Sequence, residues 1–323
     1  MVKNNLQKSA LITGISGQDG SILAECLLEK DYVVHGLVRP TSNVDNIKHL
    51  LVNPNLKIIW GDLMNVDLLR YVLSNYKIQE LYNLASQSNV RLSYEDPGHT
   101  FEVTLLGTIS LIEAVKKYSP LTRIFQAGSS AMFGESCDDD GFQREETKFK
   151  PISPYASSKL FAHNICQNYR KNDGMYISNG IFYNHESYKN KRNLGIISTL
   201  VDKALLISEG EINNFFIPNL NTTIDFGHAN DFVEAMWLVT QQEQPDDYII
   251  SSGQIISIKE LCDYIFSELG MNYKEHITTN EQNDNCFIAK GDSSKIRSIG
   301  WLPKINIYEM IDEIINKRKQ SQK

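Results

Sequence analysis

ALITGISGQDGSILAECLLEK (residues 10–30) combines a short apolar run, a glycine-rich turn and an amphipathic segment. The apolar run predicts a buried β-strand, and SILAECLLEK (21–30) has apolar residues at helical spacing. Gly14, Gly17 and Gly20 lie at the junction. Glycines there permit a tight turn and the close approach of a pyrophosphate to the helix N-terminus, where free amides attract anions. The stretch predicts a dinucleotide-binding turn, with a plain structural turn as the alternative.

Further apolar runs alternate with helical segments along the first half of the chain. Strands are predicted at YVVHGLV (32–38), LKIIWGD (56–62), ELYNLA (80–85), RIFQAGS (123–129) and MYISNGIF (175–182). The alternation predicts an α/β fold with a doubly wound parallel sheet. We expect residues 1–183 to form a dinucleotide-binding Rossmann domain. Residues 184–323 should form mainly a smaller substrate-binding lobe, with segments that return to the first domain.

Composition narrows the class of protein. The chain has 323 residues, 41% hydrophobic and 22% charged, which is typical of a soluble globular enzyme. A net charge of −7 argues against a nucleic-acid or membrane-surface binder. No apolar stretch approaches a signal peptide or a membrane span, so we expect a cytoplasmic protein. The cysteines are scattered and no HExxH motif occurs, so we expect neither disulfides nor a metal site.

The end of the second predicted strand bears on cofactor choice. A carboxylate there would bind the 2′-hydroxyl of NAD, whereas an arginine accommodates the 2′-phosphate of NADP. The chain has Arg39 and no carboxylate before Asp45. This favours NADP, with NAD as the alternative. Asp62, after the third strand, is a candidate adenine contact or a helix cap.

Three residues suggest redox chemistry. Tyr155 and Lys159 are four positions apart, so on a helix they share a face. A nearby ammonium and a positive nicotinamide ring would both favour the phenolate that proton transfer requires. Ser129 follows a predicted parallel strand, at the sheet edge where ligands bind. Its hydroxyl could hydrogen-bond a reacting alcohol oxygen, and the three residues together predict hydride transfer.

The glycine turn, Ser129, Tyr155 and Lys159 resemble those of extended short-chain dehydrogenase/reductases that modify nucleotide sugars. LYNLASQSNV (81–90), SPYASSKL (153–160), NGIFYNHES (179–187) and DFGHANDFVEAMWL (225–238) are similar, in order, to stretches of GDP-mannose 4,6-dehydratases. The resemblance implies a Rossmann fold, bound NADP, a nucleotide-sugar substrate, and dimers or tetramers.

By position, the resemblance implies a set of contact residues. The expected cofactor contacts are Gly14, Gly17, Gln18, Asp19, Gly20, Arg39, Asp62, Leu63, Leu84, Ala85, Tyr155, Lys159 and His185. The expected substrate contacts are Ser129, Ser130, Asn184 and Lys203.

One departure from the family concerns dehydration. In the dehydratases the loop after the fifth strand reads like Thr-Ser-Glu. Its glutamate removes the C5 proton once C4 is oxidised, and water leaves from C6. Here Ser129 keeps the hydroxyl, but the glutamate's position holds Ala131. Losing a positioned acid/base costs about 10²–10⁴ in rate. Glu135 is the candidate substitute, although the turn at Gly134 should aim it elsewhere.

A second departure concerns the substrate's diphosphate. The resemblance implies arginines that clamp it, but no arginine occurs between Arg192 and Arg297, and TTIDFG (222–227) stands where a dehydratase carries one. Either the substrate differs, or its phosphates rely on Lys189, Lys191, Arg192 and a helix N-terminus near Asn193.

The sequence thus favours an NAD(P)-dependent oxidoreductase or epimerase acting at C4 of a nucleotide sugar, without efficient dehydration. One alternative is a 4,6-dehydratase with a relocated acid/base. The other is a non-catalytic binder of cofactor and nucleotide sugar.

Overall fold

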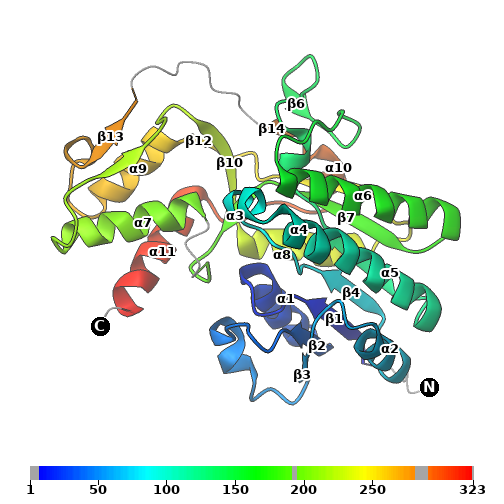
Figure 1. Cartoon of the computed structure of the whole chain (residues 1–323). Helices are drawn as coiled ribbons and strands as arrows, with labels where there is room; N and C mark the ends of the chain where they lie inside the picture. Colours follow the sequence, from blue (N-terminus) through cyan, green and yellow to red (C-terminus); the bar gives the residue numbers. More distant parts are fainter. Residues whose placement is uncertain (1–6, 191–194, 281–289, 322–323) are drawn as a thin grey trace.

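A computed structural model describes residues 7–190, 195–280 and 290–321. Its centre is a seven-stranded parallel sheet in the order β11-β7-β5-β4-β1-β2-β3 (Figure 1). The strands are β1 (Ser9–Thr13), β2 (Val33–Val38), β3 (Leu56–Trp60), β4 (Glu80–Asn83), β5 (Arg123–Ala127), β7 (Ile177–Phe182) and β11 (Asp247–Ile250). The doubly wound parallel sheet is confirmed.

Helices cover both faces of this sheet. The helices are α1 (Gln18–Glu29), α2 (Val66–Asn75), α5 (Gly107–Tyr118), α6 (Pro154–Asp173) and α8 (Ala229–Thr240). Apolar residues of α1 and α8 pack on one face, while those of α2, α5 and α6 pack on the other. The helix predicted at 21–30 begins earlier, at Gln18, because the glycine turn leads directly into it.

The second half of the chain builds a smaller lobe with its own apolar core. Its strands are β8 (Asn184–Glu186), β9 (Phe215–Ile217), β10 (Thr223–His228), β12 (Ile255–Ser257) and β13 (Ile277–Thr279). Its helices are α7 (Ile196–Ser208), α9 (Ile258–Ser267) and α11 (Ile307–Ser321). Segment 229–250 returns from this half to the large sheet as α8 and β11.

Short elements occupy the connections. They are η1 (Asp45–Leu50), α3 (Val90–Glu95), α4 (Pro97–Phe101), η2 (Glu102–Leu106), η3 (Ser130–Phe133), β6 (Phe142–Gln143), η4 (Tyr273–Glu275), β14 (Lys290–Gly291) and α10 (Ser294–Ser298).

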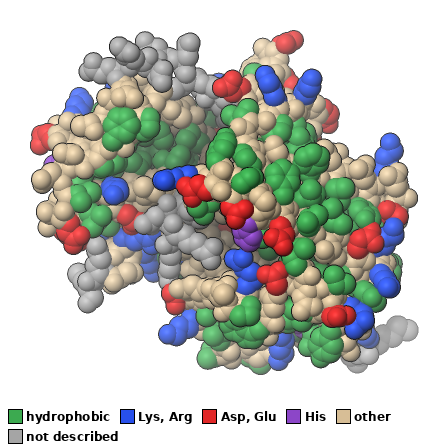
Figure 2. Space-filling model, viewed as in Figure 1, with side chains coloured by type: hydrophobic (Ala, Val, Ile, Leu, Met, Phe, Trp, Pro, Cys, Tyr) green, Lys and Arg blue, Asp and Glu red, His purple; other side chains and the backbone are tan. Residues whose placement is uncertain are grey.

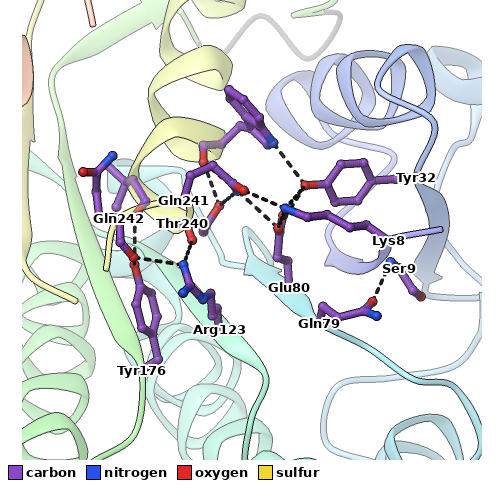
Figure 3. A network of polar contacts seen from close by, with 12 residues as sticks. Lys8, Ser9, Tyr32, Gln79, Glu80, Arg123, Tyr176, Thr240, Gln241 and Gln242 are labelled. Atoms are coloured by element: carbon purple, nitrogen blue, oxygen red, sulfur yellow. Dashed lines mark hydrogen bonds and ion pairs between the residues drawn. The ribbon is translucent and has the colours of Figure 1, made fainter. Parts of the chain in front are cut away.

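A polar network closes the amino edge of the sheet (Figure 3). Glu80, only 2% exposed, accepts hydrogen bonds from Lys8 (3.1 Å), Tyr32 (2.9 Å) and Tyr82 (2.8 Å). These donors come from separate strands and loops, so one buried carboxylate ties them together. Buried polar groups left without a partner are costly, because no water replaces the lost bond.

We expect Glu80→Ala to lower the free energy of unfolding by about 1–3 kcal/mol, because the buried Tyr82 hydroxyl loses an acceptor. Urea unfolding at neutral pH measures the change. Glu95→Ala is the matched control: its pair with Arg91 is exposed, and its loss should cost less than about 0.5 kcal/mol. Equal effects of the two substitutions would contradict a structural role for the network.

Candidate active site

The glycine turn has the geometry that its sequence predicts. Gly14 has a φ of +71°, a region that favours glycine, and its carbonyl accepts from Gly17 N at 3.0 Å. A Cβ on Gly20 would lie 2.4 Å from Gly14 O, so a side chain there would collide with the turn. Gly17 is the N-cap of α1 and brings no side chain to it. The first turn of α1 therefore presents backbone amides at the carboxyl edge of the sheet.

Ser129, Tyr155 and Lys159 meet at the same edge. Lys159 is 5% exposed and donates from Nζ to Ala127 O at 3.0 Å, at the end of β5. Its Nζ lies 5.9 Å from the centre of the Tyr155 ring. The Ser129 hydroxyl hydrogen-bonds Tyr155 closely enough to affect its acidity. The structure therefore brings the three predicted redox residues together.

The acidity of Tyr155 differs from the sequence-based expectation. Burial raises its pKa, the Asp19 charge raises it further, and the Ser129 hydrogen bond only partly offsets both. Tyr155 is thus a protonated phenol in the free protein. Burial also lowers the pKa of Lys159 to about 8, which leaves this ammonium ready to give up its proton.

We expect Lys159→Met to raise the free energy of unfolding at pH 7 by about 1–3 kcal/mol, because a buried ammonium is removed. A lysine whose pKa falls from 10.5 to about 8 on folding destabilises the protein below pH 8. This penalty fades as pH rises towards 10.5, so the gap between variant and wild type should shrink there. Thermal unfolding across pH measures it, and the half-exposed Lys203→Met is the control. A gap independent of pH would contradict this account.

No acid/base from the loop takes the place of the glutamate that Ala131 replaces. Ala131 is half-buried in η3, two residues after Ser129, whose Oγ accepts from Ala131 N at 3.2 Å. Glu135 is exposed and lines a separate surface hollow. That hollow is formed by Glu135, Ser136, Cys137, Asp138, Asp139, Thr147 and Lys148. Glu135 therefore does not substitute for the missing glutamate in this structure.

The other predicted cofactor residues lie where the strands end. Arg39 is exposed after β2, with no partner that constrains it among the described contacts. Leu84 N and Ala85 N both donate to Thr13 Oγ1 at 3.1 Å, which fixes the end of β4 against the glycine turn. Asp62 accepts from Met64 N at 2.9 Å, so its carboxylate already serves a turn. Leu84 and Ala85 thus lie beside the glycine turn, and Arg39 and Asp62 follow the neighbouring strands β2 and β3.

The four other predicted cofactor contacts have partners within the protein. Leu63 packs in the core, and Gln18, Asp19 and His185 form hydrogen bonds or an ion pair. Leu63 is buried among α2 and α5 residues. Asp19 and His185 form an ion pair of 3.0 Å, and Gln18 Oε1 accepts from Ser187 N at 2.8 Å. The partners are more than 160 positions apart, so no local pattern in the sequence could reveal them.

Two of the groups suggested as diphosphate ligands, Lys189 and the N-terminus of the following helix, already have other partners, so this part of the prediction is wrong. Lys189 is buried and paired with Glu25 at 2.6 Å. The first amides of α7 are taken by Glu186, which accepts from Ile197 N at 3.0 Å and Ser198 N at 2.9 Å.

The other residues suggested for diphosphate binding, Lys191, Arg192 and Asn193, lie outside the described residues. Of the predicted substrate contacts, Asn184 is exposed on β8, Ser130 is half-buried in η3, and Lys203 is half-exposed on α7.

Within residues 7–190, 195–280 and 290–321, every helix is too short or too polar to span a bilayer. No group of three or more histidine, cysteine, aspartate or glutamate side chains there could hold a metal ion.

Comparison with known proteins places this geometry in context. A family model described as GDP-mannose 4,6 dehydratase matches residues 11–314. The chain is 39% identical to GDP-mannose 4,6 dehydratase 1 of Arabidopsis thaliana, with 96% of this chain and 89% of that protein covered. It is 35% identical to GDP-mannose 4,6 dehydratase of Homo sapiens, with 95% and 90% covered.

Solved structures share the fold at lower identity. A UDP-glucose 4-epimerase from Thermotoga maritima superposes with a TM-score of 0.86 at 19% identity, covering 98% of this chain and 100% of that one. A dTDP-glucose 4,6-dehydratase from Bacillus anthracis, in complex with NAD, gives 0.85 at 23% identity, covering 98% and 97%. The extended short-chain dehydrogenase/reductase fold is therefore confirmed.

Proposed function

Because the chain belongs to the GDP-mannose 4,6 dehydratase family, we propose that it is an NAD(P)-dependent enzyme that oxidises or reduces C4 of a nucleotide-activated sugar, a GDP-sugar by family likeness. We further propose that it does so, with or without epimerisation, but without efficient dehydration. One observation carries the proposal: Ser129, Tyr155 and Lys159 converge, while the adjoining loop position is Ala131.

The glycine turn fits a dinucleotide. Gly20 has no room for a Cβ, and the cap of α1 has no side chain, so the backbone is open to a pyrophosphate. Arg39 after β2, with no carboxylate beside it in sequence, favours NADP over NAD. When bound, the nicotinamide supplies the two-electron acceptor or donor for a hydride at C4.

Tyr155 handles the proton at the C4 oxygen. In oxidation the O4–H bond breaks and the proton passes to the Tyr155 oxygen; in reduction it returns. Ser129 holds the same oxygen by a hydrogen bond, and Lys159 keeps a positive charge near the phenol. Since the free protein holds Tyr155 as a phenol, it is prepared to donate, and accepting a proton needs further positive charge in the site.

Dehydration needs a base at C5. Ala131 has no group that could remove that proton, and Glu135 lines a different hollow. Asp19 is a poor replacement: despite burial, its pKa is lowered by His185, so it is a weak base. The relocated acid/base required by the dehydratase alternative therefore has no support among these carboxylates, although the relatives' names favour that alternative.

The test is the redox state of the nicotinamide. Purified protein is mixed with GDP-, UDP- and CDP-sugars, and nicotinamide absorbance and fluorescence are followed. A change that depends on one sugar nucleotide supports an enzyme. Cofactor and sugar nucleotide that both bind, with no redox change and no altered sugar recovered from any member of the panel, would instead support the non-catalytic binder.

We propose in addition that residues from 184 onward supply most of the substrate lobe and that the chain forms a homodimer or homotetramer. Exposed apolar residues gather on α3, η2 and α6, and Figure 2 shows hydrophobic side chains over this region. They include Leu92 (47% exposed), Leu106 (47%) and Phe161 (53%). Such a contiguous apolar face is typical of subunit contacts.

We expect Phe161→Glu to shift the protein from oligomer to monomer, because a charge is placed in the apolar face. Sedimentation velocity measures this shift. Leu121→Glu adds the same charge at an exposed position outside the patch and should change nothing. A wild-type protein that sediments as a monomer would contradict the oligomer.

A further inference from the structure

The side chain of His185 lies between two hydrogen-bond acceptors. Its Nδ1 is 2.8 Å from Tyr183 O, and its Nε2 is 3.0 Å from Asp19 Oδ2. A carbonyl can only accept, so Nδ1 carries a proton. Burial opposes ionisation of Asp19, but His185 and Gln18 outweigh it and leave this carboxyl with a lowered pKa, so it too accepts. Both ring nitrogens must donate, and His185 is an imidazolium.

The surroundings hold this ion pair in place. The His185 ring stacks on Phe232, with centroids 4.4 Å apart, and meets the edge of Phe182 at 5.2 Å. Gln18 Nε2 donates to Asp19 Oδ1 at 2.9 Å. The side chains of Asp19 and His185 are only 25% and 11% exposed, so water screens their charges weakly.

We propose that the Asp19–His185 ion pair sets the charge of Lys159 and Tyr155, and thereby tunes the hydride-transfer step; the last clause rests on the proposed function. Asp19 lies in the first turn of α1 and acts electrostatically on both Lys159 and Tyr155. His185, on β8, pairs with Asp19 at 3.0 Å and neutralises its charge. The pair therefore limits how strongly one carboxylate acts on the two proton-transfer groups.

Two other charged groups interact with the pair. Lys159 on α6 is affected by Asp19 of α1, and Glu186 on β8 acts on His185. Asp19 favours the charged form of Lys159 and opposes that of Tyr155. Removing Asp19 should lower the titration midpoint of Lys159, and removing the imidazolium should raise it. A purely structural pair would not produce shifts of opposite sign.

The experiment uses NMR on the full chain with NADP bound, and without it. Histidine ¹⁵N spectra should show His185 doubly protonated at pH 7.5. The lysine side-chain titration of Lys159 should move down by about half a pH unit or more in Asp19→Asn and up by a similar amount in His185→Gln. The pH profile of single-turnover hydride transfer should follow the same order. His49→Gln, which breaks an exposed pair with Glu25, should leave both unchanged.

Several results would overturn the proposal. The first is a neutral His185 in the wild type at pH 7.5, which can be observed without any variant. The second is a Lys159 titration midpoint that stays fixed in Asp19→Asn and His185→Gln, or moves in the same direction in both. If the NMR shifts occur but no sugar nucleotide is oxidised or reduced, the charge-setting pair stands and the proposed reaction fails. If hydride transfer occurs without the shifts, the reverse holds.

Discussion

Tyr155→Phe is expected to slow hydride transfer by about 10²–10⁴, because the substituted ring has no oxygen to exchange a proton with the sugar hydroxyl. The measurement is single-turnover nicotinamide absorbance with saturating cofactor and substrate. Cofactor affinity should change little, since the glycine turn is untouched. The ring near Lys159 and Ser129 keeps its packing, so the protein should still fold.

Tyr94→Phe is the matched control for this substitution. Tyr94 is 61% exposed on α3, and its hydroxyl donates to Ile152 O at 2.9 Å. Removing that hydroxyl should leave hydride transfer unchanged. If Tyr155→Phe were as active as the control, the proton would have another carrier and the assignment of Tyr155 would be wrong.

Ala131→Glu is expected to confer dehydration, raising the rate of water loss from the sugar by about 10²–10⁴. The position is half-buried in η3, two residues after Ser129, and its amide donates to Ser129 Oγ at 3.2 Å, so we expect a carboxylate there to reach the sugar held by Ser129 and Tyr155. Mass spectrometry of the product, which should be lighter by one water, measures the gain.

Ala131→Gln separates the base from the bulk of the side chain. Glutamine has nearly the same shape as glutamate but cannot remove a proton at neutral pH. It should therefore confer no water loss. Equal dehydration by the two variants, or by the wild type, would contradict the role assigned to this loop position.

Much of the fold was predictable because it rests on local patterns. Apolar runs separated by helical segments predict a parallel sheet, and Gly14, Gly17 and Gly20 mark the turn at its edge. The helix predicted at 21–30 is present as α1, from Gln18 to Glu29. The strand at 247–250 was not predicted as the seventh of the large sheet, because its short apolar run carries no sign of a distant partner.

In the site, only the residues marked by a local sequence spacing or by the end of a strand could be predicted. Tyr155 and Lys159 share a helix face, and Ser129 follows the end of β5, so topology brings them together. Long-range pairs such as Asp19–His185 and Glu25–Lys189 have no local signature. Lys189 looked like a free cation in sequence, whereas the structure buries and neutralises it. The raised pKa of Tyr155 likewise depends on burial, which only the folded chain defines.

The most direct test of the central claim is exchange at C5 of the sugar. The wild-type protein, with NADP, is incubated with GDP-mannose and the other GDP-sugars in deuterated water, and the mass and labelling of the recovered sugar are measured. We expect conversion limited to C4, with hydrogen retained at C5 and no water lost. Deuterium at C5 together with a product lighter by one water would show that a base acts there without Glu at position 131, and the account would be contradicted.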